Sequence, residues 1–172
     1  MSGWRADLSG PWSGAIGDAA IGNPSWLSTP ALATPTTFGD PSITGSGSGA
    51  TLLEERVTEM LNGGFKGIAN ADVLASPSNY FINNYWAQAD VDHYGHIEGA
   101  YRVMPLSIAG GEISNMDPSM PVITYCWTGQ TSSMITAYLS VLGFDAKSLK
   151  FGSNGMIYTD LQSHQYVAPT VD

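Results

Sequence analysis

The chain has 172 residues, of which 43% are hydrophobic and only 12% charged, so one domain of ordinary size with a real core fits the composition. Fifteen acidic against six basic residues give a net charge of −9, which argues against nucleic acid and anionic membranes as main partners. A single cysteine excludes an internal disulfide, and no apolar run approaches the roughly 20 residues of a membrane-spanning helix.

Residues 1–50 are rich in Gly, Pro, Ser and Thr, and the Gly/Ser run at 45–49 predicts a flexible linker. The same segment contains several large apolar residues that a pure spacer would not need. They are Trp4, Trp12, Trp26, Leu27 and Phe38. We therefore expect an N-terminal extension that is partly docked, on the folded part or on a partner, and otherwise flexible.

Ordered structure is expected to begin near Thr51, a candidate N-cap, with a helix that stops at residues 63–64. Helical spacing places four apolar residues on one face of this helix: Leu53, Val57, Met60 and Leu61. A short strand is expected around Ile68, followed by a small helix that opens at Asn70 or Asp72. The aromatic run "NYFINNYW" predicts a further strand.

A strand is expected at 100–104, ended by Pro105, and "PVITYC" (121–126) is the clearest strand of the chain. The helix that follows has a broad apolar face and ends at Gly143. The residues expected on this face are Met134, Ile135, Tyr138, Leu139, Val141 and Leu142. "KSLKFG" (147–152) is one more strand. This alternation predicts an α/β domain with a mostly parallel sheet, in which ligands gather at the carboxyl ends of strands.

Cys126 stands at such an end, followed by a glycine-containing loop and then a helix. The tight loop can direct several backbone N–H groups at the sulfur, and the helix beginning near Ser132 directs its positive end there. Both effects stabilise a thiolate or a persulfide anion. The alternative is that Cys126 is a small buried hydrophobe that merely ends a strand. The polar turn favours chemistry over packing.

Three segments carry a resemblance to a known family. They are "YCWTGQTSSMITAYLSVLGFDAKSLKFGSNGMIY", "GHIEGAYRVMPLS" and "IANADVLASPSNYFINNYW". They occur in the order found in rhodanese-like sulfurtransferases, and the similarity spans roughly residues 51–160. The "C-aromatic-T-G-Q-T" loop resembles a subgroup that is often extracytoplasmic and sometimes carries a long N-terminal extension.

The resemblance implies a rhodanese-like single domain at 51–160, with a mostly parallel central sheet of about five strands and helices on both faces. Residues 1–50 are then an extension and residues 161–172 a C-terminal tail. It also implies an extracytoplasmic or periplasmic protein, although the first residues, "MSGWRADLSG", lack the basic start and apolar stretch of an export signal.

The resemblance further implies a sulfurtransferase that needs no cofactor. Cys126 matches the nucleophile that accepts sulfane sulfur and passes it on through a persulfide. The loop whose amides hold the transferred sulfur matches Trp127, Thr128, Gly129, Gln130, Thr131 and Ser132. The implied partners are a small sulfur donor and a thiol acceptor, with a protein persulfide as a further candidate donor. The alternative is a non-catalytic rhodanese-like module that binds a partner through its N-terminal extension.

The sequence departs from the family pattern in two places. The loop lacks the Arg or Lys that often attracts thiosulfate, which favours a neutral small thiol donor, a polysulfide or a protein persulfide. A "D-x-R" of many members is replaced by "NNY" at 83–85, and Ser132 stands where related phosphatases need an arginine. Phosphatase activity is therefore not expected.

An Asp/His cluster and one arginine are the other candidate functional groups. "DVDHYGH" gathers Asp90, Asp92, His93 and His96, but the sequence fixes no third metal ligand, and the histidine of the "GHIEGA" marker is usually structural, so we predict no metal site. Arg102 either supplies a positive charge near the loop or forms a surface salt bridge.

Overall fold

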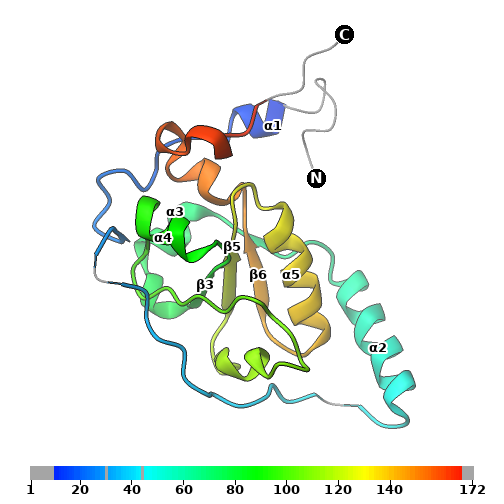
Figure 1. The fold of residues 1–172 in the computed structure, drawn as a ribbon. Helices are drawn as coiled ribbons and strands as arrows, with labels where there is room; N and C mark the ends of the chain where they lie inside the picture. Colours follow the sequence, from blue (N-terminus) through cyan, green and yellow to red (C-terminus); the bar gives the residue numbers. More distant parts are fainter. Residues whose placement is uncertain (1–9, 30, 44, 168–172) are drawn as a thin grey trace.

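The computed structural model describes residues 10–29, 31–43 and 45–167, and its centre is a four-stranded parallel sheet (Figure 1). The strand order is β2–β6–β5–β3. The strands are β2 (Gly67–Ile68), β3 (Phe81–Asn84), β5 (Val122–Tyr125) and β6 (Ala146–Leu149). The expected α/β architecture with a parallel central sheet is therefore confirmed, with four strands rather than about five.

The two faces of the sheet belong to two different cores, because successive strand residues point to opposite sides. On one face, Ile82, Ile123 and Tyr125 pack with side chains of α3 (Asn70–Ala75) and α4 (Gln88–Tyr94). On the other face, Phe81 and Val122 pack with side chains of α5 (Gln130–Val141). Helices therefore cover both faces, as expected.

The helix α5 buries only part of the apolar face that the sequence pattern predicted: Ile135 and Leu139 are confirmed on the core face, whereas Met134 and Tyr138 are not. Its buried residues are Ser132, Ile135, Thr136, Leu139 and Ser140. Met134, expected on the core face, is 73% exposed, and Tyr138 is exposed too. The broad apolar pattern was compatible with two helix faces, and packing selected the one that includes small hydroxyl residues. The helix gives way at Gly143, whose φ of +100° is suited to glycine.

Helix α2 (Gly49–Asn62) begins one turn before the expected Thr51, because the side chain of Ser48 accepts a hydrogen bond from the Thr51 N–H at 3.2 Å. Two residues of the expected linker thus form a helix start. Leu53 and Leu61, predicted on the packed face, are exposed, and α2 contributes no fully buried residue. It lies beside α5 (Figure 1), and Arg56 donates hydrogen bonds to the last carbonyls of that helix.

The strand expected at 100–104 does not form, which accounts for the missing fifth strand. Tyr101 makes only isolated bridges, one to Asn83 and one to Ala33. Beyond it, the Asn83 side chain takes the place of a backbone ladder, because its Oδ1 accepts the Val103 N–H at 2.9 Å. The preceding marker instead contributes β4 (His96–Ile97), which pairs antiparallel with β1 (Trp26–Leu27).

The N-terminal segment docks on the domain through its described aromatic residues. Trp12, in the short helix α1 (Gly10–Ser13), is 3% exposed and stacks on Tyr166 near the other end of the chain. Trp26 sits in β1, and Phe38 packs edge-on against Phe81. Trp4 lies outside the described residues. Among the described helices, none is both long and apolar enough to cross a membrane.

The described residues also contain five short 3-10 turns. They are Pro77–Asn79, Glu112–Asn115, Gly152–Gly155, Tyr158–Asp160 and Gln162–His164. The last three follow β6 and close over the edge of the sheet at which Cys126 stands.

Candidate active site

Cys126 directly follows β5 and is 3% exposed, so the loop surrounds its sulfur almost completely. The backbone N–H groups of Gly129 and Ser132 donate to Sγ at 3.2 and 3.4 Å. The Ser132 hydroxyl lies 3.6 Å from Sγ. The tight turn expected from the sequence therefore directs two amides at a single sulfur atom, and the thiol itself donates to the Ser132 hydroxyl oxygen.

Gly129 allows this turn because it has a φ of +85° and immediately precedes α5. Its carbonyl accepts the Ser133 N–H at 3.0 Å, which begins the helix. The sulfur consequently lies at the N-terminal end of α5, where unpaired N–H groups and the helix dipole favour negative charge. Two amides at this end of the helix donate directly to the cysteine sulfur.

The backbone of the turn after β6 packs directly against the cysteine loop. Gly152 has a φ of +55°, and a Cβ added there would lie 2.3 Å from the Cys126 carbonyl oxygen. The next two residues bind the loop: the Ser153 N–H donates to the Cys126 carbonyl, and the Asn154 side chain donates to the Trp127 carbonyl at 2.8 Å. Only glycine permits this close approach, so the segment after β6 fixes the loop backbone.

Trp127, the residue after the cysteine, is held in an aromatic stack. Its ring lies parallel to that of Trp86 at 4.1 Å between centroids and parallel to that of His164 at 3.9 Å. Tyr94 packs edge-on against it. We call Trp86, Trp127 and His164 the aromatic stack. It holds the loop on the side of the sheet covered by α3 and α4.

On the opposite side of the loop, the sulfur meets a pair of buried hydroxyl groups. Ser132 Oγ and Ser148 Oγ lie 2.8 Å apart, and both residues are fully buried. Ser148 Oγ is also 3.5 Å from the Gly129 carbonyl oxygen. We call Ser132 and Ser148 the serine pair. Sequence analysis placed Ser148 in a strand and gave it no role at the sulfur.

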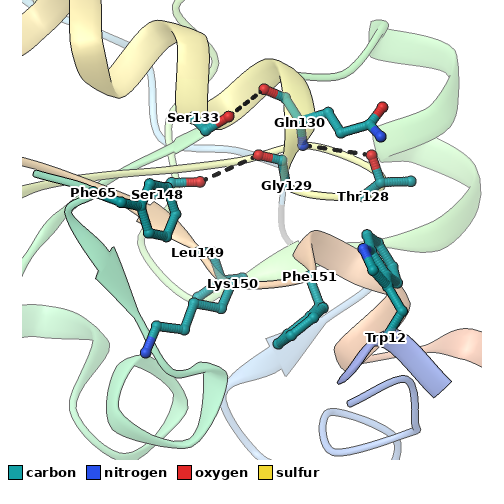
Figure 2. A pocket seen from close by; sticks show the side chains of 10 residues that line it. All are labelled: Trp12, Phe65, Thr128, Gly129, Gln130, Ser133, Ser148, Leu149, Lys150 and Phe151. Carbon is teal, nitrogen blue, oxygen red and sulfur yellow. Dashed lines mark hydrogen bonds between the residues drawn. The ribbon is translucent and has the colours of Figure 1, made fainter. Parts of the chain in front are cut away.

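The outer residues of the loop are more exposed than the cysteine. Thr128, Gly129 and Gln130 line a pocket of about 170 Å³ beside the loop (Figure 2). Thr131 is exposed and lines a separate depression together with Tyr85. Cys126 lines neither cavity, so both flank the sulfur rather than contain it.

The pocket beside the loop is also lined by a positively charged side chain. Lys150 follows β6 and lines this pocket with aromatic rings of Trp12, Phe65 and Phe151 (Figure 2). Sequence analysis described the loop as uncharged, which is true of its own residues, but missed Lys150. The available signal was that β6 is parallel to β5, so residues after both strands meet at one edge of the sheet.

The remaining candidates lie apart from the sulfur. His96 is buried with Nδ1 2.9 Å from the Ile97 carbonyl oxygen, whereas His93 is exposed. In the part of the chain that the structure describes, no three His, Cys, Asp or Glu side chains are grouped so as to hold a metal ion. Arg102 donates its Nε hydrogen to the Trp86 carbonyl at 2.7 Å, a contact that neither of its two sequence interpretations anticipated.

The loop is anchored to the "GHIEGA" marker through Tyr125. Burial raises the pKa of this phenol, so it stays neutral, and its oxygen accepts the Ile97 N–H at 3.4 Å. The marker thus stabilises the end of the strand that delivers Cys126. Asn83, in the "NNY" replacement, is buried and structural, since its side chain binds the Val103 backbone.

The chain was compared with known proteins. Residues 75–157 match the family model described as a rhodanese-like domain. No curated protein sequence matches the chain. A rhodanese-related protein from Thermoplasma volcanium is similar at 15% identity over 59% of this chain and 96% of its own, with a TM-score of 0.45. A protein from Lactobacillus plantarum is similar at 29% identity over 63% of this chain and 92% of its own, with a TM-score of 0.43.

The matched residues extend from the end of α3 to the turn after β6 and include the whole cysteine loop. The segments quoted above for their resemblance overlap this range. Residues 75–157 therefore have a rhodanese-like α/β fold.

Proposed function

We propose that the protein is a sulfurtransferase that carries sulfane sulfur as a persulfide on Cys126. The observation that supports this most directly is the convergence of the Gly129 and Ser132 amides on Sγ at 3.2 and 3.4 Å. An apolar packing role would not require hydrogen-bond donors around the sulfur. Donors that converge on a nearly buried sulfur suit an anion, which a thiolate and a persulfide both are.

The proposed reaction has two steps. In loading, the Cys126 thiolate attacks the terminal sulfur of a donor. With tetrasulfide the balance is Cys–S⁻ + S₄²⁻ → Cys–S–S⁻ + S₃²⁻, and with thiosulfate the leaving group is sulfite. In delivery, an acceptor thiolate attacks the outer sulfur, RS⁻ + Cys–S–S⁻ → RSS⁻ + Cys–S⁻. No electron carrier or cofactor enters either step, which is covalent catalysis by an activated nucleophile.

Each loop residue has a distinct part in this proposal. The amides of Gly129 and Ser132 donate to the sulfur. Trp127 holds the loop backbone through its stacked ring and through its carbonyl oxygen, which accepts three hydrogen bonds. Thr128, Gln130 and Thr131 lie at the outside of the loop, where a donor or acceptor approaches.

The charge distribution bears on the donor. The net charge of −9 disfavours the approach of thiosulfate and tetrasulfide alike, because both are dianions. The two donors differ in their leaving groups: the neutral loop residues offer no cation to bind the sulfite that thiosulfate releases, whereas tetrasulfide releases no sulfite. Lys150 offsets this locally but lies in the flanking pocket rather than against Sγ. We therefore propose that polysulfide or a protein persulfide loads Cys126 faster than thiosulfate does.

The alternative is a non-catalytic module that binds a partner through the N-terminal extension. In the structure, Trp12 and Trp26 of that extension contact the domain itself. Less aromatic surface is then left for a partner, whereas the sulfur site is assembled. Both observations favour the enzyme. The extracytoplasmic location stays a prediction from sequence.

Intact-protein mass tests the proposal. Incubation with tetrasulfide should add about one sulfur atom, roughly 32 Da, which a reducing agent removes and which Cys126→Ser does not acquire. Thiosulfate, tested separately at the same concentration, should load more slowly. Absence of the mass gain with both donors, in a folded protein, would contradict the sulfurtransferase and favour the binding module.

A further inference from the structure

We propose that the serine pair stabilises Cys126 as the leaving group of the delivery step. Ser132 donates its hydroxyl hydrogen to the departing thiolate, and Ser148 accepts that hydrogen when Sγ carries no charge. This inference rests on the proposed sulfur transfer and adds a division of labour between its two steps.

The geometry leaves few partners for these hydroxyl groups. Ser132 Oγ has two neighbours, Cys126 Sγ at 3.6 Å and Ser148 Oγ at 2.8 Å. Ser148 Oγ has Ser132 Oγ and, at 3.5 Å, the Gly129 carbonyl oxygen. Because both serines are fully buried, the two protons must be used within this small group.

Two hydrogen-bond arrangements satisfy the pair. In the first, Ser148 donates to Ser132, and Ser132 donates to Sγ. In the second, Ser132 donates to Ser148, and Ser148 donates to the Gly129 carbonyl, which also keeps its bond from the Ser133 N–H. Each arrangement uses both hydroxyl hydrogens, so rotation of two hydroxyl groups converts one into the other with no proton left unpaired.

The charge on Sγ selects between the arrangements. When delivery ends, Sγ is the leaving thiolate, a strong acceptor that favours the first arrangement. In the persulfide the charge sits on the outer sulfur, and Sγ is an uncharged bridging atom that accepts poorly, which favours the second. During delivery the S–S bond breaks and its electron pair returns to Sγ. The Ser132 hydroxyl therefore turns toward Sγ as the charge develops.

The same bond affects loading differently. A stabilised thiolate leaves more readily but attacks less strongly, because nucleophilicity falls as the thiolate is stabilised. Removing the Ser132 hydroxyl should consequently slow delivery while leaving loading little changed. A purely structural role of Ser132 would instead slow both steps or lower the folded fraction.

The experiment measures the two steps separately by rapid quench and intact mass. Loading is followed with tetrasulfide, and delivery is followed from desalted persulfide protein mixed with excess dithiothreitol. For Ser132→Ala we expect delivery to slow about tenfold, the size of one hydrogen bond to a charged group, and loading to change less than about twofold. Ser148→Ala should shift delivery less, and the double variant should match Ser132→Ala, because Ser148 acts only through Ser132.

Thr136→Val is the matched control. Thr136 lies one turn further along α5, and its buried hydroxyl has no hydrogen-bond partner, so both steps should keep their wild-type rates. Equal slowing of both steps in Ser132→Ala, no slowing, or additive effects of the two serine variants would overturn the inference alone. Failure of the wild-type protein to load would overturn the proposed function and, with it, this inference.

Discussion

The two sides of the cysteine loop differ in how they hold it. On the side of α3 and α4, the contacts are large and apolar: Trp86 is 1% exposed and stacks on Trp127. On the side of α5, the corresponding space holds hydroxyl groups. These are Thr124, Ser132, Thr136, Ser140 and Ser148, all buried. One side is an ordinary apolar core, whereas the other side combines an apolar core with these five hydroxyl residues, which we call the polar layer and of which only the serine pair lies at the sulfur.

The difference shows that rigidity and chemistry are supplied by different elements. Apolar stacking fixes the loop backbone without preferring any charge on the sulfur. Buried hydroxyl groups contribute less packing, but they rotate and can follow a charge. A loop that must present an anion needs both, and variants on each side should therefore fail in different ways.

The largest effect is expected where the loop backbone meets the segment beneath it. Gly152→Ala adds a Cβ 2.3 Å from the Cys126 carbonyl oxygen at a φ of +55°, so either the loop or the turn after β6 must move. Backbone strain and overpacking together should destabilise the protein by about 5 kcal/mol. Urea unfolding measures this loss. Gly155→Ala, in the same turn but without a positive φ, is the control, and equal losses would contradict the argument.

The aromatic side is tested by Trp86→Ala, which removes a buried ring and should cost about 4 kcal/mol. Because Trp127 loses one stacking partner, the loop should also open, so that iodoacetamide alkylates Cys126 faster than in the wild type. Trp86→Phe keeps a ring and removes an indole N–H that has no partner, so its loss should be clearly smaller. Unchanged alkylation in Trp86→Ala would show that the stack does not restrain the loop.

Much of the fold could be predicted from sequence because its signals are local. The strand at 122–125, the helix after it and the stop at Gly143 follow from a β-rich run, a helical period and a glycine. The strand at 100–104 failed for a tertiary reason. The Asn83 side chain binds the Val103 backbone across the sheet, and no pattern within 100–104 reports that contact.

The candidate site likewise contains features that local sequence predicts and features that depend on the order of the strands. The amides around Cys126 could be predicted, since a strand, a glycine loop and a helix imply them. Ser148 and Lys150 could not be assigned, because their relation to the sulfur depends on β6 lying next to β5. The exposed Met134 shows a further limit: hydrophobicity alone did not reveal that α5 turns serine and threonine toward the sheet.

A smaller effect is expected from the extension, which reaches the site only at its edge. Trp12→Ala removes a ring that stacks on Tyr166 at 4.3 Å and meets Phe151 edge-on. The extension can detach as a unit, so the loss is limited to its docking energy, about 2 kcal/mol. Limited proteolysis should then cleave within residues 10–29, with the domain intact. Resistance equal to that of the wild type would mean that Trp26 and Phe38 hold the extension alone.

The smallest effect is expected on the hydroxyl side, away from the sulfur. Thr136 has a buried Oγ1 without a hydrogen-bond partner, so Thr136→Val replaces an unsatisfied hydroxyl by a methyl group of similar size. Unfolding free energy should stay the same or rise by about 1 kcal/mol, since no hydrogen bond is lost and a desolvation cost disappears. Ser132→Ala removes a hydroxyl from the same helix face but breaks the contacts to Sγ and to Ser148, so it should lower the stability. If Thr136→Val were instead the more destabilising of the two, the polar layer would act as one structural unit, and the distinction between the serine pair and its neighbours would be lost.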